Sequence, residues 1–221
     1  MRFTILTLFP EACEAYFNTS ILKRAQVKKL ISINIIDIRR FTNDKHNKAD
    51  DKPYGGGPGM VMKAKPILKA HGSVKWKVGS DKRKVIILSA AGKKFTSKMA
   101  KHLSLNTVHL VLIAGHYEGI DERVKKILKA EEVSIGPYVL TGGELPAMAV
   151  VDAIVRHIPG VLGKAGSLEG ARYGVGVPAY TRPEVITYKS KKYRVPLVLL
   201  SGDHKKIEEW RRRMRKTPKA K

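Results

Sequence analysis

Short apolar runs rich in β-branched residues recur along the first half of the chain, and polar or turn-forming residues bound each run. The predicted strands are residues 3–9, 31–38, 84–89 and 108–115. Between them, apolar side chains recur at the three-to-four-residue spacing of an amphipathic helix. The predicted helices of this kind are residues 11–30, 96–104 and 119–130. Strands that alternate with helices indicate an α/β fold with a parallel sheet.

Residues that cap or break helices define the ends of these patterns. Thr96 and Asp121 precede helical patterns and suit N-cap or first-turn positions. A further helix is predicted over residues 144–157, with Pro146 in its first turn. The last helix starts near Asp203, after a basic, strand-like stretch. It is the only helix that we predict in the C-terminal part of the chain.

Glycine and proline are dense in two segments, which we predict to be loops. Residues 53–60 read PYGGGPGM, a composition that an ordinary helix or strand does not tolerate. Residues 160–183 form a second such segment, which connects the α/β part to a small C-terminal piece. We therefore predict a main domain over residues 1–159, a connecting loop over residues 160–189 and a short basic piece over residues 190–221.

The charge of the chain points to an anionic partner. Its 43 Lys and Arg residues outnumber its 19 Asp and Glu residues, which leaves a net charge of +24. Nucleic acid is the first candidate, because Lys and Arg displace counterions from phosphates. The alternative is that the charge serves only solubility. Residues 204–221 favour nucleic acid, since they hold nine basic and two acidic residues.

Cysteine usage and the start of the chain bear on its location. The single cysteine, Cys13, excludes an internal disulfide and fits a reducing cytosol. No cysteine or histidine spacing indicates a metal cluster. The apolar residues 3–10 are too few to span a membrane. We expect a cytoplasmic protein with no membrane partner.

Three turn segments that follow predicted strands could converge on one ligand. They are residues 88–94, 113–119 and 134–147. In an open α/β sheet, ligands bind outside the carboxyl ends of the strands. No phosphate-binding lysine loop accompanies these turns, so backbone groups and apolar walls would hold the ligand. An adenosine without phosphates, such as S-adenosylmethionine, suits such a site. The alternative is that the glycines of these turns only supply positive φ angles.

Six motifs occur in an order that resembles a known family. They are PYGGGPGM, AGHYEGIDERV, SIGPYVLTGGELPAM, HIPGVLG, YTRPEV and VLLSGDH. Together they resemble the bacterial tRNA (guanine-N1)-methyltransferases, the TrmD family of the SPOUT class, over residues 1 to about 210. The resemblance implies a SPOUT-type parallel sheet with a deep C-terminal trefoil knot in the main domain, plus a small truncated helical C-terminal extension.

The resemblance also implies an activity and partners. The family methylates N1 of the guanine at position 37 of tRNA, immediately 3′ of the anticodon, with S-adenosylmethionine as the methyl donor. Its members are homodimers with the active site at the subunit interface, and they are associated with Mg²⁺. The implied partners of this chain are therefore tRNA and a second copy of itself.

Matching motifs carry the family's binding residues onto this chain. The implied cofactor-binding residues are Leu88, Ser89, Gly115, Tyr117, Glu118, Ser134, Ile135, Gly136, Pro137, Tyr138, Val139, Leu140, Gly142, Gly143 and Pro146. The implied substrate-binding residues are Asp50, Tyr54, Gly57, Gly59 and Arg182. In this reading the PYGGGPGM loop helps to form the pocket for the target guanine, not a phosphate cradle.

Proton removal from guanine N1 requires a base, and charge develops on O6. Arg156 matches the arginine that the family places on the guanine, and its fork of donors suits O6. The alternative for Arg156 is an i,i+4 ion pair with Asp152. The family's general base is an aspartate, but Gly176 occupies that position here. Glu169 is our first candidate for a displaced base, followed by Glu118 or water.

The missing carboxylate leaves other functions open. One alternative is a catalytically weakened RNA-binding relative that keeps both binding activities. Another is a SPOUT methyltransferase that acts on a different RNA. His116 also departs from the family, which often has an arginine there. It is either a solvated side chain or a replacement for part of the missing charge or base.

Overall fold

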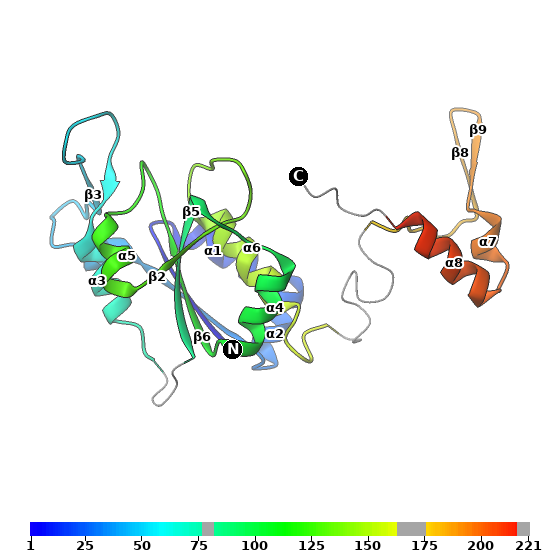
Figure 1. Cartoon of the computed structure of the whole chain (residues 1–221), viewed down its shortest axis with the longest axis horizontal. Helices are drawn as coiled ribbons and strands as arrows, with labels where there is room; N and C mark the ends of the chain where they lie inside the picture. The colour runs from blue at the N-terminus through cyan, green and yellow to red at the C-terminus, as the bar shows by residue number, and fades with distance from the viewer. Residues whose placement is uncertain (77–81, 163–175, 216–221) are drawn as a thin grey trace. The chain divides into compact units, whose positions relative to one another are not determined.

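The computed structural model describes residues 1–76, 82–162 and 176–215 of the chain. The chain divides into two compact units, Met1–Leu162 and Gly163–Lys221. The first unit holds an α/β sandwich, and the second holds a small hairpin with two helices (Figure 1). Within the described residues, no helix is long and apolar enough to cross a membrane.

A five-stranded parallel sheet forms the centre of the first unit, which confirms the predicted α/β class. Its order is β2-β1-β6-β5-β7. The strands are β1 (Arg2–Thr7), β2 (Ser32–Asp37), β5 (Arg83–Lys94), β6 (His109–Ala114) and β7 (Glu131–Ser134). All six residues of β6 are buried, as expected for a central parallel strand with helices on both faces.

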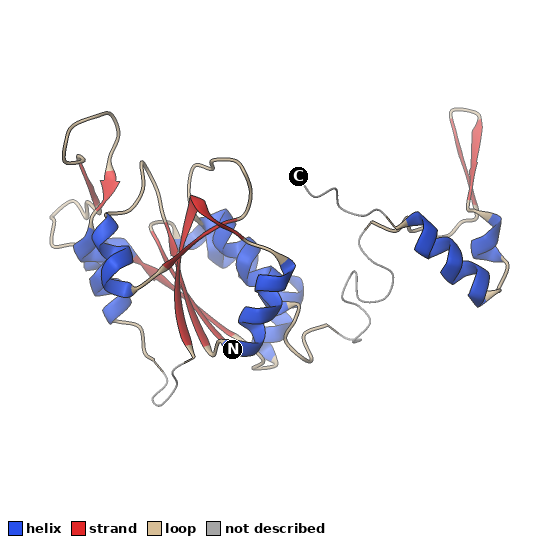
Figure 2. Cartoon of the chain, viewed as in Figure 1, coloured by secondary structure: helices blue, strands red, loops and turns tan. Residues whose placement is uncertain are grey.

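Helices cover both faces of this sheet (Figure 2). One face packs against α1 (Pro10–Phe17), α2 (Ser20–Val27), α4 (Ser97–Asn106) and α6 (Glu144–Val155). The other face packs against the 3₁₀ helix η1 (Ile38–Phe41), α3 (Ala64–Gly72) and α5 (Glu122–Leu128). The apolar positions that predicted strands and helices are therefore the ones that meet in these two cores.

The predicted helix ends agree with the structure at three places and fail at one. The side chains of Thr96 and Asp121 cap α4 and α5 by accepting hydrogen bonds from backbone N–H groups. Pro146 lies in the first turn of α6. The single helix predicted over residues 11–30 is wrong, because the chain forms α1 and α2 instead. Ser20 has a φ of 45°, which a continuous helix does not accommodate.

Several elements have signals too short to be recognised from periodicity. They are β7, α3 and the two-stranded pair β3 (Asp50–Asp51) and β4 (Val61–Met62). Strand β5 also continues to Lys94, beyond its predicted end at residue 89. Its register against β7 shifts between Leu88 and Lys93. Gly92 lies inside this irregularity, where a Cβ atom would come within 2.5 Å of the Val133 nitrogen.

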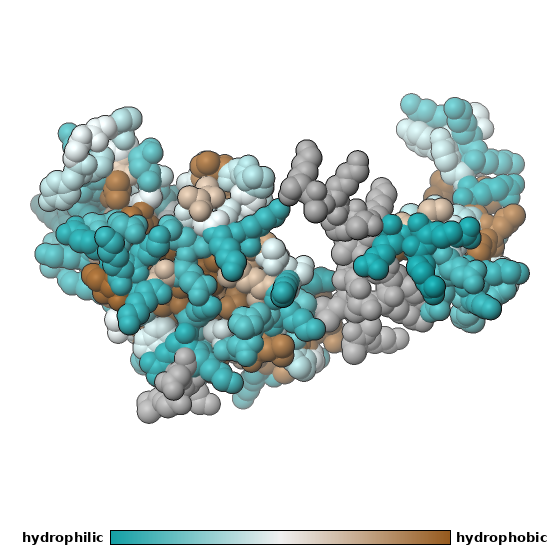
Figure 3. All heavy atoms as spheres, in the orientation of Figure 1, coloured by the Kyte–Doolittle hydropathy of each residue, from teal (hydrophilic) through white to brown (hydrophobic). Residues whose placement is uncertain are grey.

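The second unit contains the hairpin of β8 (Val185–Tyr188) and β9 (Lys191–Arg194), followed by α7 (Leu197–Leu200) and α8 (His204–Met214). The prediction of a single helix here is wrong, since the one-turn helix α7 precedes α8. Helix α8 begins where it is predicted to, directly after Asp203, whose side chain caps it. Trp210 is buried, with its ring 6.3 Å from that of Tyr180. Hydrophilic residues cover most of the face of the molecule drawn in Figure 3.

Candidate functional site

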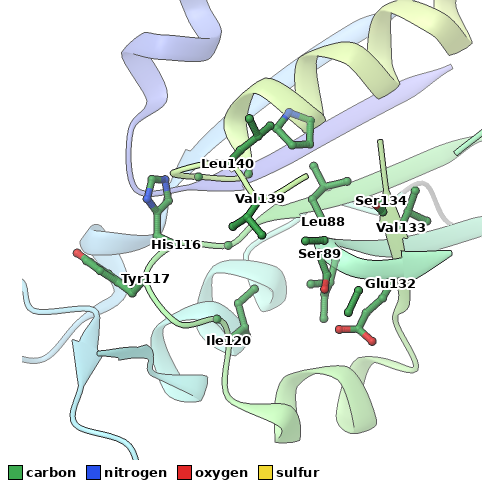
Figure 4. Close-up of a pocket in the computed structure, with 18 of the residues that line it drawn as sticks. Leu88, Ser89, His116, Tyr117, Ile120, Glu132, Val133, Ser134, Val139 and Leu140 are labelled. Atoms are coloured by element: carbon green, nitrogen blue, oxygen red, sulfur yellow. The ribbon is translucent and has the colours of Figure 1, made fainter. Parts of the chain in front are cut away.

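A cavity of about 390 Å³ opens at the carboxyl ends of β5, β6 and β7 (Figure 4). Residues 115–122 form one wall, residues 138–143 form another, and Pro146 closes it from the first turn of α6. All the residues predicted to bind the cofactor line this cavity, except Gly136 and Pro137. The structure therefore brings together turns from Leu88 to Pro146, which are 58 positions apart in the sequence.

The glycines of this site serve close packing. Gly115, Gly136, Gly142 and Gly143 are absent from the described residues with positive φ, so the alternative that they only supply such angles is wrong. A Cβ atom on Gly143 would lie 2.6 Å from the Ala114 Cα atom. A Cβ atom on Gly142 would lie 2.3 Å from the His116 ring. Only hydrogen at these Cα atoms lets the two walls approach.

A buried carboxylate lies beneath the two walls. Glu144 is 7% exposed and accepts a 2.5 Å hydrogen bond from the Thr7 hydroxyl. Its other oxygen lies 2.6 Å from His116 Nε2. The Phe9 ring packs against the imidazole, with 4.9 Å between the ring centroids. The expectation that His116 is solvated is therefore wrong, and its Nε2 atom is engaged with Glu144.

Backbone contacts join the same two walls directly. The Gly143 N–H donates a 2.8 Å hydrogen bond to the Gly115 carbonyl. An isolated antiparallel bridge pairs His116 with Gly142. The buried side chains and these backbone bonds together hold residues 138–143 against residues 115–119. The cavity is consequently formed before any ligand enters.

The cavity is acidic although the chain as a whole is strongly basic. Its charged lining residues are Glu118, Asp121, Glu122, Glu132 and Lys125. The positive charge of Lys125 is balanced by nearby carboxylates, because its Nζ atom lies 2.5 Å from Glu132 and 3.8 Å from Glu122. Hydrogen bonds from the Arg123 side chain hold the pKa of Asp121 below its usual value. Such a lining favours a cationic ligand without phosphates.

Comparison with known proteins identifies the family. The sequence profile of the family described as "tRNA (Guanine-1)-methyltransferase TrmD" matches residues 1–221. The chain belongs to this family. It is 50% identical to a tRNA (guanine-N(1)-)-methyltransferase of Carboxydothermus hydrogenoformans, over 96% of this chain and 82% of that protein. It is 47% identical to one of Bacillus pumilus, over 96% of this chain and 86% of that protein.

The PYGGGPGM loop of this family member lies against the rim of the cavity. Its glycines at 55, 56, 57 and 59 all have positive φ, between 81° and 111°. The Glu118 N–H donates a 3.0 Å hydrogen bond to the Met60 carbonyl, and the Met62 N–H donates a 2.9 Å bond to Gly119. A Cβ atom on Gly59 would come within 2.5 Å of the Glu118 side chain.

The residues predicted to bind the guanine are distributed over both units. Gly59 is next to the cavity rim, and Asp50 pairs with Met62 in the β3-β4 ladder. Tyr54, at the tip of the loop, is fully exposed at 100%. Arg182 belongs to the second unit. That these residues, with Gly57, contact the guanine stays a prediction.

Arg156 is remote from the cavity within one chain. It follows the last residue of α6, twelve positions after Glu144 at the cavity end. A helical rise of 1.5 Å per residue separates these two positions by about 18 Å. The predicted alternative, an ion pair with Asp152, is absent, although the structure describes both residues. Asp152 instead accepts a hydrogen bond from Tyr16, which raises the pKa of that phenol to about 12.

The other predicted catalytic position lies elsewhere. Glu169 is outside the described residues, so its candidacy as a base stays a prediction. Gly176 has a φ of 79°, in the left-handed region that favours glycine. Within the part of the chain that the structure describes, no three His, Cys, Asp or Glu side chains are grouped to hold a metal ion.

Sequence reasoning missed several lining residues, among them Ile120, Lys125 and Glu132. Lys125 and Ile120 come from the segment around α5, whose face toward the cavity is not evident from periodicity. Glu132 belongs to β7, a strand of four residues with two glutamates at its start. The signal that could have found Glu132 is its position just before the SIGPY motif.

Proposed function

We propose that this protein transfers the methyl group of S-adenosylmethionine to N1 of guanine 37 in tRNA. The observation that carries the proposal is the cavity at the carboxyl ends of β5, β6 and β7. Its lining includes nearly all the residues that the family motifs assign to the methyl donor. Membership of the tRNA (guanine-1)-methyltransferase family supplies the reaction and the class of substrate.

The lining of the cavity fits S-adenosylmethionine. The volume of about 390 Å³ lies in the range of small-molecule sites, and Ile135, Leu140 and Pro146 offer apolar surface to the adenine. Lys125 and Arg123 balance the charges of Glu132 and Asp121, and the remaining carboxylates, Glu118 and Glu122, favour the positive charge of the donor over a phosphate-bearing nucleotide. When bound, S-adenosylmethionine supplies an activated methyl group on its sulfonium sulfur.

A second copy of the chain completes the site in this proposal. Arg156 donates to guanine O6, where negative charge develops as N1 loses its proton. Because about 18 Å of helix separates Arg156 from the cavity of its own chain, it acts on the cavity of the partner. The active site therefore lies at the interface of a homodimer.

Two glutamates are candidates for the base that removes the N1 proton. Glu169 is the first candidate, and Glu118 the second, since it already lines the cavity. Proton transfer to such a group contributes about 10²- to 10⁴-fold to the rate of comparable enzymes. Mg²⁺ assistance is a separate expectation from the family, and no step here depends on it.

Two segments of the main domain that are distant in sequence lie in contact beside the cavity. The close contact of residues 115–119 with residues 138–143 supports a deep trefoil knot in this part of the main domain.

Residues 190–221 form the C-terminal extension that binds tRNA phosphates, with residues 160–189 as the connection. The basic, exposed side chains of α8, including Lys205, Arg212 and Arg213, support this role. Such an enzyme works in the cytoplasm.

Single-turnover methyl transfer tests the proposed function. Labelled S-adenosylmethionine is incubated with excess protein and an unmodified tRNA transcript that has guanine at position 37. We expect methylation at N1 of that guanine and none in a transcript with adenosine there. Binding of both partners without transfer would instead support the catalytically weakened relative.

The same assay tests the base. Glu169→Gln is expected to lower the single-turnover rate by at least about 100-fold. Glu184→Gln is the matched control, because this exposed glutamate follows the YTRP motif and is expected to leave the rate unchanged. An unchanged rate in Glu169→Gln would remove Glu169 from the mechanism while leaving the methyltransferase activity intact.

A further inference from the structure

The β8-β9 hairpin of the second unit has two chemically different faces. Residues opposite each other in an antiparallel pair share a face, as do alternate residues along each strand. The register pairs Ile186 with Tyr193 and Tyr188 with Lys191. One face therefore carries Ile186, Tyr188, Lys191 and Tyr193. The opposite face carries Val185, Thr187, Lys192 and Arg194.

The first of these, which we term the aromatic face, is open to solvent. Ile186 is 54% exposed, Tyr188 is 61% exposed and Tyr193 is 56% exposed. The hairpin extends from the helices of its unit (Figure 1). An isolated two-stranded hairpin is only marginally stable in water, and it gains little from side chains left in solvent. Stability of the fold therefore does not explain two neighbouring tyrosines at this place.

Positive charge adjoins the aromatic face. Lys191 lies on this face and Lys189 lies in the turn beside it, and residues 185–194 contain no Asp or Glu. Lys192 and Arg194 lie on the opposite face. Lys189 and Ser190 both have positive φ, as in the tight turns that join such strands. The Lys189 ammonium lies 5.6 Å from the centroid of the Tyr188 ring. A partner on this surface therefore meets flat aromatic rings and cations together.

We propose that the aromatic face binds RNA by stacking unpaired bases on Tyr188 and Tyr193, while Lys191 on the same face and Lys189 in the adjoining turn bind phosphates. Charge complementarity selects a polyanion, and the exposed rings select one with flat, apolar groups between its charges. Unpaired RNA offers both at the spacing of a single nucleotide. Duplex RNA keeps its bases stacked inside and offers these rings nothing to stack on. That the RNA is tRNA rests on the proposed function.

Equilibrium binding of unmodified tRNA to the full chain tests this proposal. Replacing Tyr188 or Tyr193 by alanine is expected to weaken tRNA binding about tenfold for each tyrosine. Tyr188→Phe and Tyr193→Phe keep the ring and are expected to bind within about twofold of the wild type. Thr187→Ala, on the opposite face of the same strand, is the matched control and is expected to change nothing.

Salt dependence and a second RNA separate stacking from charge. Lys191→Gln is expected to reduce the slope of log Kd against log salt by about one ion, whereas the alanine variants of the tyrosines leave that slope unchanged. The tyrosine variants are expected to bind a blunt RNA duplex as the wild type does. Unchanged tRNA affinity in the alanine variants, or equal losses in the alanine and phenylalanine variants, would overturn the proposal.

Two further readouts keep this result apart from the proposed function. S-adenosylmethionine affinity is expected to be the same in all hairpin variants, because the cavity belongs to the first unit. Weakened tRNA binding in a chain that methylates nothing would support the hairpin and refute the methyltransferase. A change of oligomeric state in the alanine variants would show that the aromatic face binds another copy of the chain, and would also overturn the proposal.

Discussion

The cavity at the carboxyl ends of β5, β6 and β7 and the β8-β9 hairpin use polar and aromatic side chains in opposite ways. At the cavity, Glu144 is buried and both of its oxygens are engaged, by Thr7 and His116. On the hairpin, Tyr188 and Tyr193 are more than half exposed and have lysines as neighbours. The first arrangement fixes one geometry before a ligand arrives. The second leaves side chains free to adapt to a large and flexible partner.

The two regions differ because the proposed partners carry opposite charges, a small cationic donor and a polyanionic RNA. A small cationic donor gains most from a rigid cavity, because its few contacts must all be in place at once. A polyanion gains from many weak contacts that are spread over a surface. The cavity has an acidic lining inside a chain of net charge +24, so the two proposed partners are expected to bind at separate places.

The largest effect on the methylation rate is expected from a variant outside both the cavity of its own chain and the β8-β9 hairpin. Arg156→Ala is predicted to lower single-turnover methylation by about 10²- to 10³-fold, because a donor to the developing charge on O6 is lost. S-adenosylmethionine and tRNA affinities are predicted to stay within about threefold of the wild type. Parallel rate and binding measurements check this, and a loss of donor affinity would contradict it.

A subunit-mixing experiment sharpens the same prediction. Arg156→Ala is co-expressed with a variant whose cavity is blocked, Gly143→Ala, and the differently tagged heterodimer is purified. If Arg156 acts on the partner's cavity, the heterodimer regains one intact site and part of the wild-type activity. Persistent inactivity, with each homodimer folded, would place Arg156 and the cavity in the same chain's site.

Gly143→Ala is predicted to abolish the preformed cavity. A Cβ atom there would lie 2.6 Å from Ala114 Cα and 2.7 Å from the Gly115 nitrogen, which are backbone atoms that no side-chain rotation removes. We expect S-adenosylmethionine affinity to fall about 100-fold, with tRNA affinity unchanged. Gly72→Ala is the control, since a Cβ atom at that helical position has nothing within 4 Å.

A smaller effect is expected from Glu144→Gln. The amide cannot accept hydrogen bonds from Thr7 and His116 as the carboxylate does, so the free energy of unfolding is predicted to fall by about 1–3 kcal/mol. Donor affinity is predicted to fall about tenfold, because His116 no longer holds Gly142 in place. Urea unfolding and calorimetric titration measure the two effects. Glu14→Gln, at an exposed position of α1 outside the cavity lining, is the control.

The smallest effect concerns pH and is confined to the end of the sheet opposite the cavity. Burial lowers the pKa of His71 and of His109 from the usual value of about 6.5. Below that pH, the unfolded chain binds more protons at these sites than the folded chain. Stability is therefore complete above about pH 6.5 and declines as the pH falls through the lowered pKa values.

Urea unfolding at several pH values measures this decline. His109→Gln is expected to reduce the loss of stability between pH 7.5 and pH 5, because one of the two histidines is then removed. Donor affinity is expected to remain unchanged in this variant, since His109 starts β6 and the cavity lies beyond its other end. An undiminished pH dependence would remove His109 as a source of the effect.

The hydrophobic pattern was sufficient for four strands of the sheet, because each of them contains a run of apolar residues rich in β-branched side chains. It was insufficient for β7, which begins with two glutamates and becomes a strand only by pairing with β5. The break between α1 and α2 was missed because the apolar spacing continues through Ser20, although the backbone does not. Local periodicity contains no information about such tertiary constraints.

The candidate site was likewise predicted only in part, its residues from motifs but not the contacts between them. Motifs located the residues of the cavity. Two of the three segments follow strands that the pattern also predicted, and the third follows β7, which it did not predict. The alternative that Gly142 and Gly143 only supply positive φ is wrong, since these glycines permit close packing of two distant walls. The motifs were silent on the engagement of His116 by Glu144, because a contact across 28 residues depends on the fold.

Calorimetric titration of S-adenosylmethionine into the wild-type chain and into Gly143→Ala, each without tRNA, tests the central claim most directly. A cavity that is complete in the first unit predicts saturable binding to the wild type and a loss of about 100-fold in the variant, while the variant's tRNA affinity is retained. Equal donor binding by the two chains, or wild-type binding that appears only when tRNA is present, would contradict a preformed cavity.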